Sequence, residues 1–468
     1  MNKIHQKILM ALIACVGIAP AADDEVVYKP ISITGQFDNG HIVKGRTHRD
    51  ILNGFENKTM DMDFFTRTSV WLTQEATVRE RFTITVGVGG ILWYTQPAIE
   101  KDPLTMQTMF GPGISQAQGV YKWGDVENPS ATLQVGYFPY KYNPDAKNLG
   151  EYLLRSGTYP GYLVSGGWNM ISSAAFMAQG ARFNLPLWDG KFESDFLLTM
   201  ETNLPPLFSL SPSYVATVKP VKGVRVGAGI SCNHCLSARP SKESPKMIDN
   251  AYIKGYVIDS SAGDYKVALE RDSSNFYTFQ GIKVSANASV DPKAFVPMDF
   301  LGPEDLKVYG EVAVLGWKNH PYLYEDRTER MPIMGGINLP TFKLLDVLSL
   351  EVEYLNNRFA NNYRNVLYDA YPTWVTFSDA NGYGTKAEAD SVLNEANAYD
   401  KSWNSRDNWK WTVYGKKEIT KGVRLYAQAA SDHLRTFNFN FGPFPAYVPV
   451  TNKNGKEWYY LVRLEFGI

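Results

Sequence analysis

The last residues of the chain, 458–468, carry an apolar side chain at every second position. These positions run from Trp458 to Ile468, and the residues between them include Arg463, Glu465 and Gly467. Side chains of a strand alternate between two faces, so the segment is predicted to be a strand with one apolar face. Aromatic residues lie near both ends of that face, as on a lipid-facing strand. A soluble β-sandwich can also end on such a strand, so other features must decide.

A terminal strand of this kind resembles the closing strand of Gram-negative outer-membrane β-barrels. Those barrels usually finish on Phe or Trp, whereas here Phe466 is third from the end and Ile468 is last. The resemblance implies recognition by the outer-membrane assembly machinery. It also implies pairing with the first strand near residues 31–37, because lipid tolerates no open sheet edge.

The N-terminal residues follow the pattern of a secretory signal peptide. Lys3 and Lys7 precede an uncharged apolar stretch, residues 8–18, and small residues ending at Ala21 give a cleavage site. This stretch is too short to span a bilayer as a helix. A lipobox ending at Cys15 is the alternative. We expect cleavage near Ala21 and export.

The composition fits an exported, sheet-forming chain. It contains 28 Tyr, 24 Phe and 11 Trp, and the mature part has no apolar run long enough for a transmembrane helix. The chain has 47 basic and 48 acidic residues, a balance that excludes a nucleic-acid partner. We expect a signal peptide, residues 1–21, and a single barrel domain, residues 22–468.

Alternating apolar and polar stripes recur along the whole chain, separated by turn signals such as Asp189-Gly190. They predict an all-β protein, a transmembrane antiparallel β-barrel of about 16 strands, within about 14 to 18. Short connections alternate with long ones, as when periplasmic turns face extracellular loops. A barrel of this size leaves an aqueous channel. The expected strands are 31–39, 64–75, 81–94, 115–124, 130–139, 172–185, 191–202, 211–219, 223–232, 275–290, 305–317, 331–340, 347–357, 407–416, 422–434 and 456–468.

If the apolar stripes face lipid, the residues between them face the lumen. Acids are then concentrated on the strands near residues 311 and 351, and bases on the last three strands. Neighbouring walls of opposite charge would set an electric field across a pore. Alternatively, these residues are ordinary polar positions on a water-facing wall, whose balanced charge requires no functional explanation. The candidate pore-lining residues are Glu311, Glu351, Glu353, Lys410, Arg424 and Arg463.

The long connection at residues 140–171 is a candidate constriction. Asn143 and Pro144 form a plausible N-cap and first position of a helix that would reach Arg155. A short helix in a long loop after the fifth strand resembles the inward-folded constriction loop of sixteen-stranded porins. That resemblance implies that the narrowest part is lined by Asp145, Glu151 and Arg155. Alternatively, the loop caps the outer rim, packed by Tyr159, Tyr162 and Trp168.

Cys232 and Cys235 enclose Asn233 and His234, which gives three residues of metal-ligand type. Zinc sites need four ligands, or three and an open position. Leu236 stands where haem attachment would need a histidine. We therefore expect a local disulfide and no metal.

The connection at residues 358–406 carries four aromatic residues and a polar segment, 385–398, with helical character. The aromatic side chains could stack on sugar rings or simply pack against neighbouring loops. These residues are Tyr368, Tyr371, Trp374 and Phe377.

Motifs of enzymes are missing from the sequence, which has no G-x-S-x-G, no H-E-x-x-H and no phosphate-binding glycine loop. We therefore predict no enzyme and no cofactor. The expected protein is a porin-like channel for small hydrophilic solutes in a Gram-negative outer membrane, in contact with lipid and lipopolysaccharide, either alone or as a homo-oligomer. A non-conducting surface barrel that acts as an adhesin or scaffold is the main alternative, and a barrel enzyme is the third.

Overall fold

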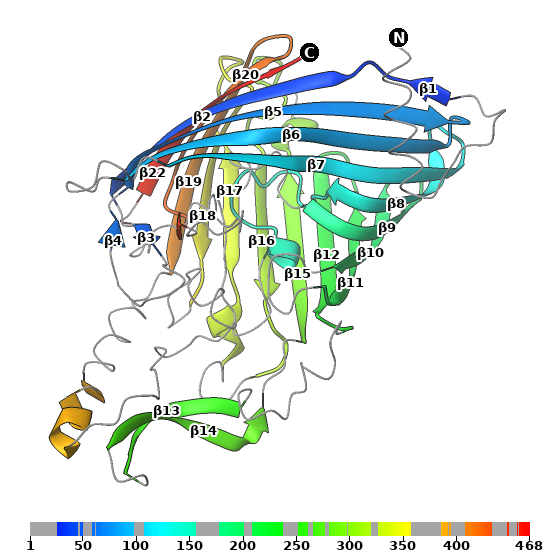
Figure 1. The fold of residues 1–468 in the computed structure, drawn as a ribbon. Helices are drawn as coiled ribbons and strands as arrows, with labels where there is room; N and C mark the ends of the chain where they lie inside the picture. Colours follow the sequence, from blue (N-terminus) through cyan, green and yellow to red (C-terminus); the bar gives the residue numbers. More distant parts are fainter. Residues whose placement is uncertain are drawn as a thin grey trace.

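The described strands form a closed antiparallel barrel (Figure 1). The computed structural model describes residues 26–44, 47–49, 59–60, 62–97, 107–155, 177–200, 208–236, 251–260, 265–276, 280–296, 298–319, 326–356, 385–391, 393–394, 408–432, 447–448, 456 and 458–468. The barrel strands are β2 (Ser32–Lys44), β5 (Met62–Val78), β6 (Phe82–Pro97), β7 (Gln107–Gly124), β8 (Pro129–Pro139), β9 (Met177–Leu187), β10 (Phe192–Met200), β11 (Leu210–Val218), β12 (Val224–Asn233), β15 (Gly281–Val290), β16 (Val308–Val314), β17 (Ile333–Asn338), β18 (Val347–Tyr354), β19 (Trp409–Thr420), β20 (Val423–Ala430) and β22 (Trp458–Gly467).

The barrel is closed between its first and last strands. β22 pairs with β20 on one side and with β2 on the other, and β2 pairs in turn with β5. The register places Thr34 opposite Gly467 and Phe37 opposite Leu464. Ile33 and Ile468 exchange two backbone hydrogen bonds of 3.0 Å each. The predicted pairing of the last strand with the first is therefore confirmed.

The alternation along each strand sorts side chains between the outside and the lumen. In β22, Tyr460, Val462, Leu464 and Phe466 are exposed on the outside. Arg463 between them is 2% exposed and points inward to Asp38. The outer face is a belt of exposed apolar side chains, which suits lipid, and the inner face is polar. Exposed side chains of this belt include Phe37, Val70, Val88, Val135, Phe196, Ile230, Val352 and Val413.

Glycines let large inner side chains lie flat on the barrel wall. A Cβ on Gly89 would lie 2.7 Å from Trp71 Cε3, and one on Gly113 would lie 3.7 Å from Trp71 Cη2. The indole of β5 therefore covers the neighbouring strands β6 and β7. Close approach of this kind is a common reason for glycine within a strand.

Tight turns and long connections alternate around most of the barrel, as predicted; the connection from β15 to β16, residues 291–307, is the exception. Short turns join β5 to β6, β7 to β8, β9 to β10, β11 to β12 and β19 to β20, and β22 ends at the same rim. We call this the short-turn rim and the opposite end the long-loop rim. A short strand, β1 (Val26–Tyr28), pairs with β5 beyond β2 at the short-turn rim.

A two-stranded hairpin projects from the long-loop rim (Figure 1). Its strands are β13 (Ala251–Asp259) and β14 (Lys266–Phe276). No strand was expected between residues 232 and 275, so this hairpin was not anticipated. Register shifts interrupt the pairing of its two strands. Three short strands, β3 (Thr47–Arg49), β4 (Thr59–Met60) and β21 (Tyr447–Val448), form a separate small sheet.

The predicted fold class and strand number are confirmed, since sixteen strands close the barrel. The expected signal peptide lies outside the described residues. Of the segment expected to be helical at 385–398, residues 386–391 and 393–394 are helical. The described residues contain no helix that is long and apolar enough to cross a membrane.

An arginine on the outer face of β8 tests the assignment of its two faces. Val135 is 48% exposed on the outside, whereas the adjacent Gln134 points inward to Gln118 and Arg182. We expect Val135→Arg to lower the free energy of unfolding in lipid by about 2–4 kcal/mol, because it places a charge in hydrocarbon. Gln134→Arg is the matched control and should have a much smaller effect. Equal effects in urea titrations of the two variants in vesicles would contradict the assignment.

Candidate functional site

Residues 140–155, which we call the inner segment, run into the lumen after β8. Tyr140 donates a 2.9 Å hydrogen bond to Asp195 of β10. Asn148 donates one of 2.7 Å to Thr412 of β19. Each partner faces the inside of the barrel, so the inner segment crosses from β8 to the opposite wall.

One carboxylate of that wall binds three successive backbone N–H groups. Glu351 of β18 accepts hydrogen bonds from the N–H groups of Lys147, Asn148 and Leu149, the last two at 2.8 Å. The hydroxyl of Tyr309 donates a further 2.8 Å bond to it. Glu351 is 0% exposed. A buried charge of this kind is stable only when its oxygens are satisfied, and here they are.

A second carboxylate binds the next part of the inner segment. Glu311 of β16 accepts the N–H groups of Glu151 and Tyr152, both at 3.0 Å. It also accepts the Asn143 amide at 2.8 Å and the Tyr142 hydroxyl. Glu151 itself accepts the backbone N–H of Asn143 at 3.0 Å, which closes the segment on itself.

The two carboxylates explain why the expected helix is mostly absent. N–H groups that would bond within a helix beginning at Pro144 donate to Glu351 instead. Gly150 and Glu151 then have φ values of 84° and 59°, outside the helical region. The helix is therefore only α2 (Tyr152–Arg155), and its expected start at Pro144 is wrong.

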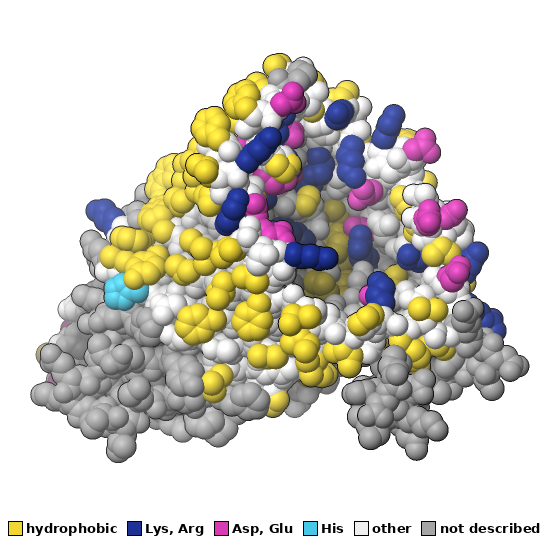
Figure 2. Space-filling model, turned by 90° about the horizontal axis from the view of Figure 1, so that it is seen from above, with side chains coloured by type: hydrophobic (Ala, Val, Ile, Leu, Met, Phe, Trp, Pro, Cys, Tyr) yellow, Lys and Arg dark blue, Asp and Glu magenta, His cyan; other side chains and the backbone are white. Residues whose placement is uncertain are grey.

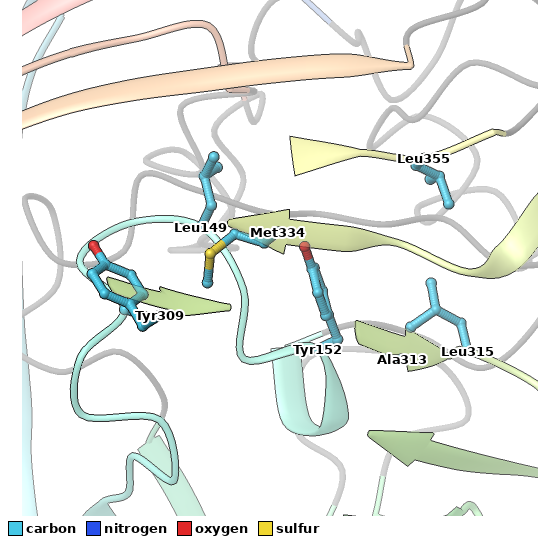
Figure 3. Close-up of a cluster of buried hydrophobic side chains, with 8 residues drawn as sticks. Leu149, Tyr152, Tyr309, Ala313, Leu315, Met334 and Leu355 are labelled. Atoms are coloured by element: carbon cyan, nitrogen blue, oxygen red, sulfur yellow. The ribbon is translucent and has the colours of Figure 1, made fainter. Parts of the chain in front are cut away.

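Apolar side chains of the inner segment pack against the wall beside these hydrogen bonds (Figure 3). Leu149 and Tyr152 are 0% exposed, among residues of β16 and β17 such as Met334. Gly150 has a φ of 84°, a conformation that side chains rarely adopt, and a Cβ there would also lie 2.6 Å from Met334 Cε, so glycine is favoured at this position. Leu153 belongs to a second cluster on the inner wall, with Phe138, Tyr140, Tyr142, Ala178, Leu197 and Val215.

The tyrosines of the inner segment remain neutral donors. Burial, and then the charges of Glu311 and Glu151, raise the pKa of Tyr142 well above its usual range. Burial and the charge of Glu353 do the same to the pKa of Tyr152, whose hydroxyl donates a 2.9 Å bond to Glu353. These hydroxyls can therefore donate to carboxylates throughout the physiological pH range.

Ion pairs occupy the turn of the inner segment that approaches the short-turn rim. Asp145 lies 3.2 Å from Arg225 and 4.0 Å from Lys307. Burial alone would raise the pKa of Asp145, but the hydrogen bond to Ser289 and the two cations outweigh it and hold the pKa below its ordinary value.

The part of the wall formed by β2, β5, β20 and β22 carries further charges that face the lumen. Asp38 of β2 accepts from Arg67 at 2.7 Å and from Arg463 at 2.6 Å. Nearer the short-turn rim, Arg424 pairs with Glu465 at 2.9 Å. Seen from this rim, charged side chains surround a central hollow and apolar side chains lie outside (Figure 2). The charges described on this part of the wall are thus arranged as opposite pairs.

The structure brings together part of the predicted site. Glu311 of β16 and Glu351 and Glu353 of β18 are on the same wall, separated by β17, and they are buried against the inner segment. Lys410 is also buried, at 2% exposure, whereas Arg424 keeps 42% of its side chain exposed.

Two of the three residues predicted to line the constriction have described side chains in the inner segment. Asp145 and Glu151 both lie in it, whereas the side chain of Arg155 lies outside the described residues. The aromatic residues expected at 159–168 and 368–377 also lie outside them.

Several contacts of the inner segment were not anticipated. Asn148 donates a 2.6 Å bond to Asp432, and Arg225 donates one of 2.9 Å to Asn143. Both partners are distant in sequence, and no spacing signal connects them. The sequence had singled out Asn143 only as the N-cap of a helix.

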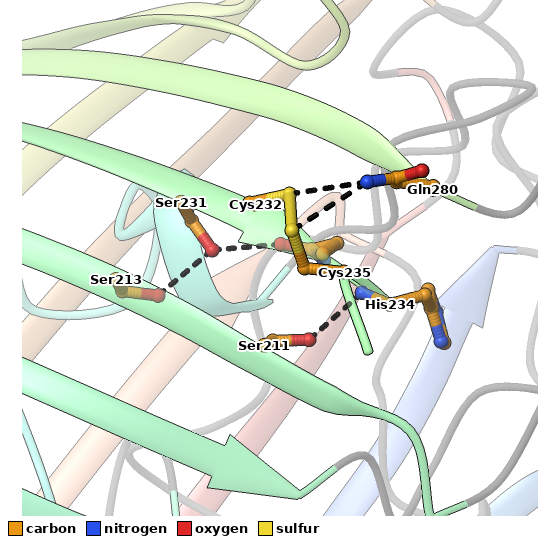
Figure 4. The surroundings of a disulfide bond; sticks show 8 residues. Ser211, Ser213, Ser231, Cys232, His234, Cys235 and Gln280 are labelled. Atoms are coloured by element: carbon orange, nitrogen blue, oxygen red, sulfur yellow. Dashed lines mark hydrogen bonds between the residues drawn. A yellow bond between two sulfur atoms is a disulfide. The ribbon is translucent and has the colours of Figure 1, made fainter. Parts of the chain in front are cut away.

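Cys232 and Cys235 form a disulfide at the long-loop end of β12, with their Cα atoms 5.4 Å apart (Figure 4). Among the described residues, no group of three or more His, Cys, Asp and Glu side chains is placed to hold a metal ion.

Comparison with known proteins finds similarity only among solved structures. No family model matches the sequence, and no curated protein does. A variant of the Rh. blastica porin has 8% identity and a TM-score of 0.42, covering 94% of this chain and 100% of that one. Salmonella typhi OmpF, solved with daunomycin, has 9% identity and a TM-score of 0.41, covering 94% and 97%. An OccD1 (OprD) variant has 9% identity and a TM-score of 0.37, covering 96% and 97%.

The class of the protein follows from its own geometry. A closed barrel of sixteen strands, with an apolar outer belt and a polar lumen, is a porin-like outer-membrane β-barrel.

Removal of the Glu351 carboxylate should release the inner segment. Glu351→Ala leaves three buried N–H groups without an acceptor, and we expect docking to weaken by about 3 kcal/mol or more. Limited proteolysis of the folded barrel should then cleave within residues 140–155. Glu465→Gln, on β22, where the carboxylate pairs with Arg424, is the control and should stay resistant. Resistance of Glu351→Ala would contradict the anchoring role.

The ion pairs of Asp145 should add a pH-dependent part to this docking. Docking lowers the pKa of Asp145. The stabilisation by its ion pairs is therefore complete at a pH above the ordinary pKa of 3.8, and it is lost as the pH falls through the lowered pKa of the docked state. Wild type and Asp145→Asn should therefore differ in protease resistance at pH 7 and 5 and converge in strong acid. A difference that grows on acidification would contradict this sign.

Proposed function

We propose that the protein is a channel of the porin type through which small hydrophilic solutes diffuse passively. The observation that best supports this is the inner segment, which is fixed inside a polar lumen by Glu311 and Glu351. A passage narrowed on one side, with no chemistry and no cofactor, selects by width and by the charges along it.

The charged residues have two different roles in this proposal. Glu151, Glu311, Glu351 and Glu353 fix the inner segment and contribute little net field to the passage. Asp145, with Arg225 and Lys307, borders the passage on one side, and the Arg424–Glu465 pair borders it on the other. Arg155 remains a candidate at the constriction.

The membrane context belongs to the same proposal. The chain is exported through a signal peptide cleaved near Ala21 and is inserted by the assembly machinery of a Gram-negative outer membrane, which recognises β22. Its apolar belt contacts lipid and lipopolysaccharide there. Assembly as a homo-oligomer is compatible with such a belt.

A non-conducting surface barrel is the second candidate. The β13–β14 hairpin that projects from the long-loop rim favours it, because a scaffold or adhesin presents elements of this kind. Recognition of polysaccharide would then use the loop aromatics.

Planar-bilayer recording of the refolded protein separates the two candidates. We expect stepwise single-channel currents, and an increased step size for Glu351→Ala because the inner segment no longer narrows the lumen. Glu465→Gln, which leaves the segment docked, should change ion preference more than step size. Absence of stepwise current from correctly folded protein would exclude the channel, and binding to insoluble glycans would then favour the scaffold.

A further inference from the structure

The disulfide between Cys232 and Cys235 lies within reach of solvent at the long-loop rim. Cys232 is the second-last residue of β12, where it pairs with Ile282 of β15, and Cys235 follows the end of the strand. Both cysteines are half-buried and not enclosed in a core. A thiol from outside the barrel can therefore approach the sulfur atoms.

The bond adds little to the stability of the barrel. The cysteines are separated by only 3 positions, and the entropic stabilisation by a disulfide falls with the length of the loop that it closes. The turn is also held without it. Leu210 and Leu236 exchange backbone bonds of 2.9 and 3.1 Å, and the His234 N–H donates a 2.9 Å bond to Ser211 Oγ. The two sulfur atoms should therefore stay close together after reduction.

One polar side chain is directed at the sulfur atoms. Gln280 Nε2 lies 3.5 Å from Cys235 Sγ and 3.8 Å from Cys232 Sγ (Figure 4). An amide N–H stabilises a thiolate more than a thiol, and a more stable thiolate is a better leaving group. The imidazole of His234 points away from the bond (Figure 4), so Gln280 is the group that assists.

We propose that Cys232 and Cys235 form a reversible thiol–disulfide exchange site, independent of any channel activity. A thiolate from solution attacks Cys232 Sγ and forms a mixed disulfide. The bond to Cys235 breaks, and Cys235 leaves with the electron pair as a thiolate that accepts from Gln280. A second external thiolate then attacks the external sulfur of the mixed disulfide. Two thiols are oxidised to one disulfide, the pair gains two electrons, and its thiolates take up protons from water.

Titration of the folded barrel with glutathione redox buffers tests this proposal. Quenching with a polyethylene-glycol maleimide should reveal a gain of two thiols that reverses with oxidised glutathione. The heat-modifiable gel mobility of the folded barrel should not change. A pair that stays oxidised until the barrel is unfolded, or a reduction that unfolds the barrel, would overturn the proposal.

Two variants examine the steps separately. Cys235→Ser has no second thiol to displace glutathione from Cys232, so in oxidised glutathione it should accumulate one glutathione on Cys232, as detected by mass spectrometry. If this variant does not fold, Cys232→Ser takes its place, with the adduct expected on Cys235. Gln280→Leu should be reduced several-fold more slowly, since its amide no longer stabilises the leaving thiolate. No adduct on either single variant would overturn the exchange mechanism, and an unchanged rate for Gln280→Leu would overturn the role of the amide.

Discussion

Lipid offers no hydrogen bonds to a peptide backbone, and this constraint determines most of the structure. Every strand must pair on both sides, so β22 has to meet β2 and the sheet becomes a cylinder. The period of two then turns one face of every strand to lipid and the other to the lumen. The polar interior in which the inner segment lies follows from the same constraint.

Inside this cylinder, the buried carboxylates hold the inner segment in place. Glu311 and Glu351 are strand residues, yet their partners are mainly N–H groups of the inner segment. A carboxylate that is surrounded by donors is compensated locally. The acids that look in sequence like half of a charged pore are therefore a set of anchors. The electrostatics of the proposed passage would depend on Asp145 and on the paired charges of β2, β5, β20 and β22.

The barrel was predictable because its signal is local. Alternation within a strand such as β22, and the sorting of short and long connections, can be read within about ten residues at a time. The pairing of β22 with β2 followed from topology, since the two edges of the sheet had to meet, whereas its register was not predicted. The inner segment was harder: its apolar residues Leu149 and Tyr152 were visible, but its helix was overestimated, because capture of its N–H groups by Glu351 involves a residue about 200 positions away. Partners such as Asp432 leave no trace in the local pattern.

The sequence distances within the anchored lumen also bear on the order of folding. The inner segment is synthesised directly after β8, but its partners Glu311, Glu351 and Asp432 follow 160, 203 and 284 positions later in the chain. Its N–H groups have no carboxylate to bind until β16 and β18 are in place. Docking of the segment is therefore a late event, which reports that the far half of the cylinder has been built in the correct register.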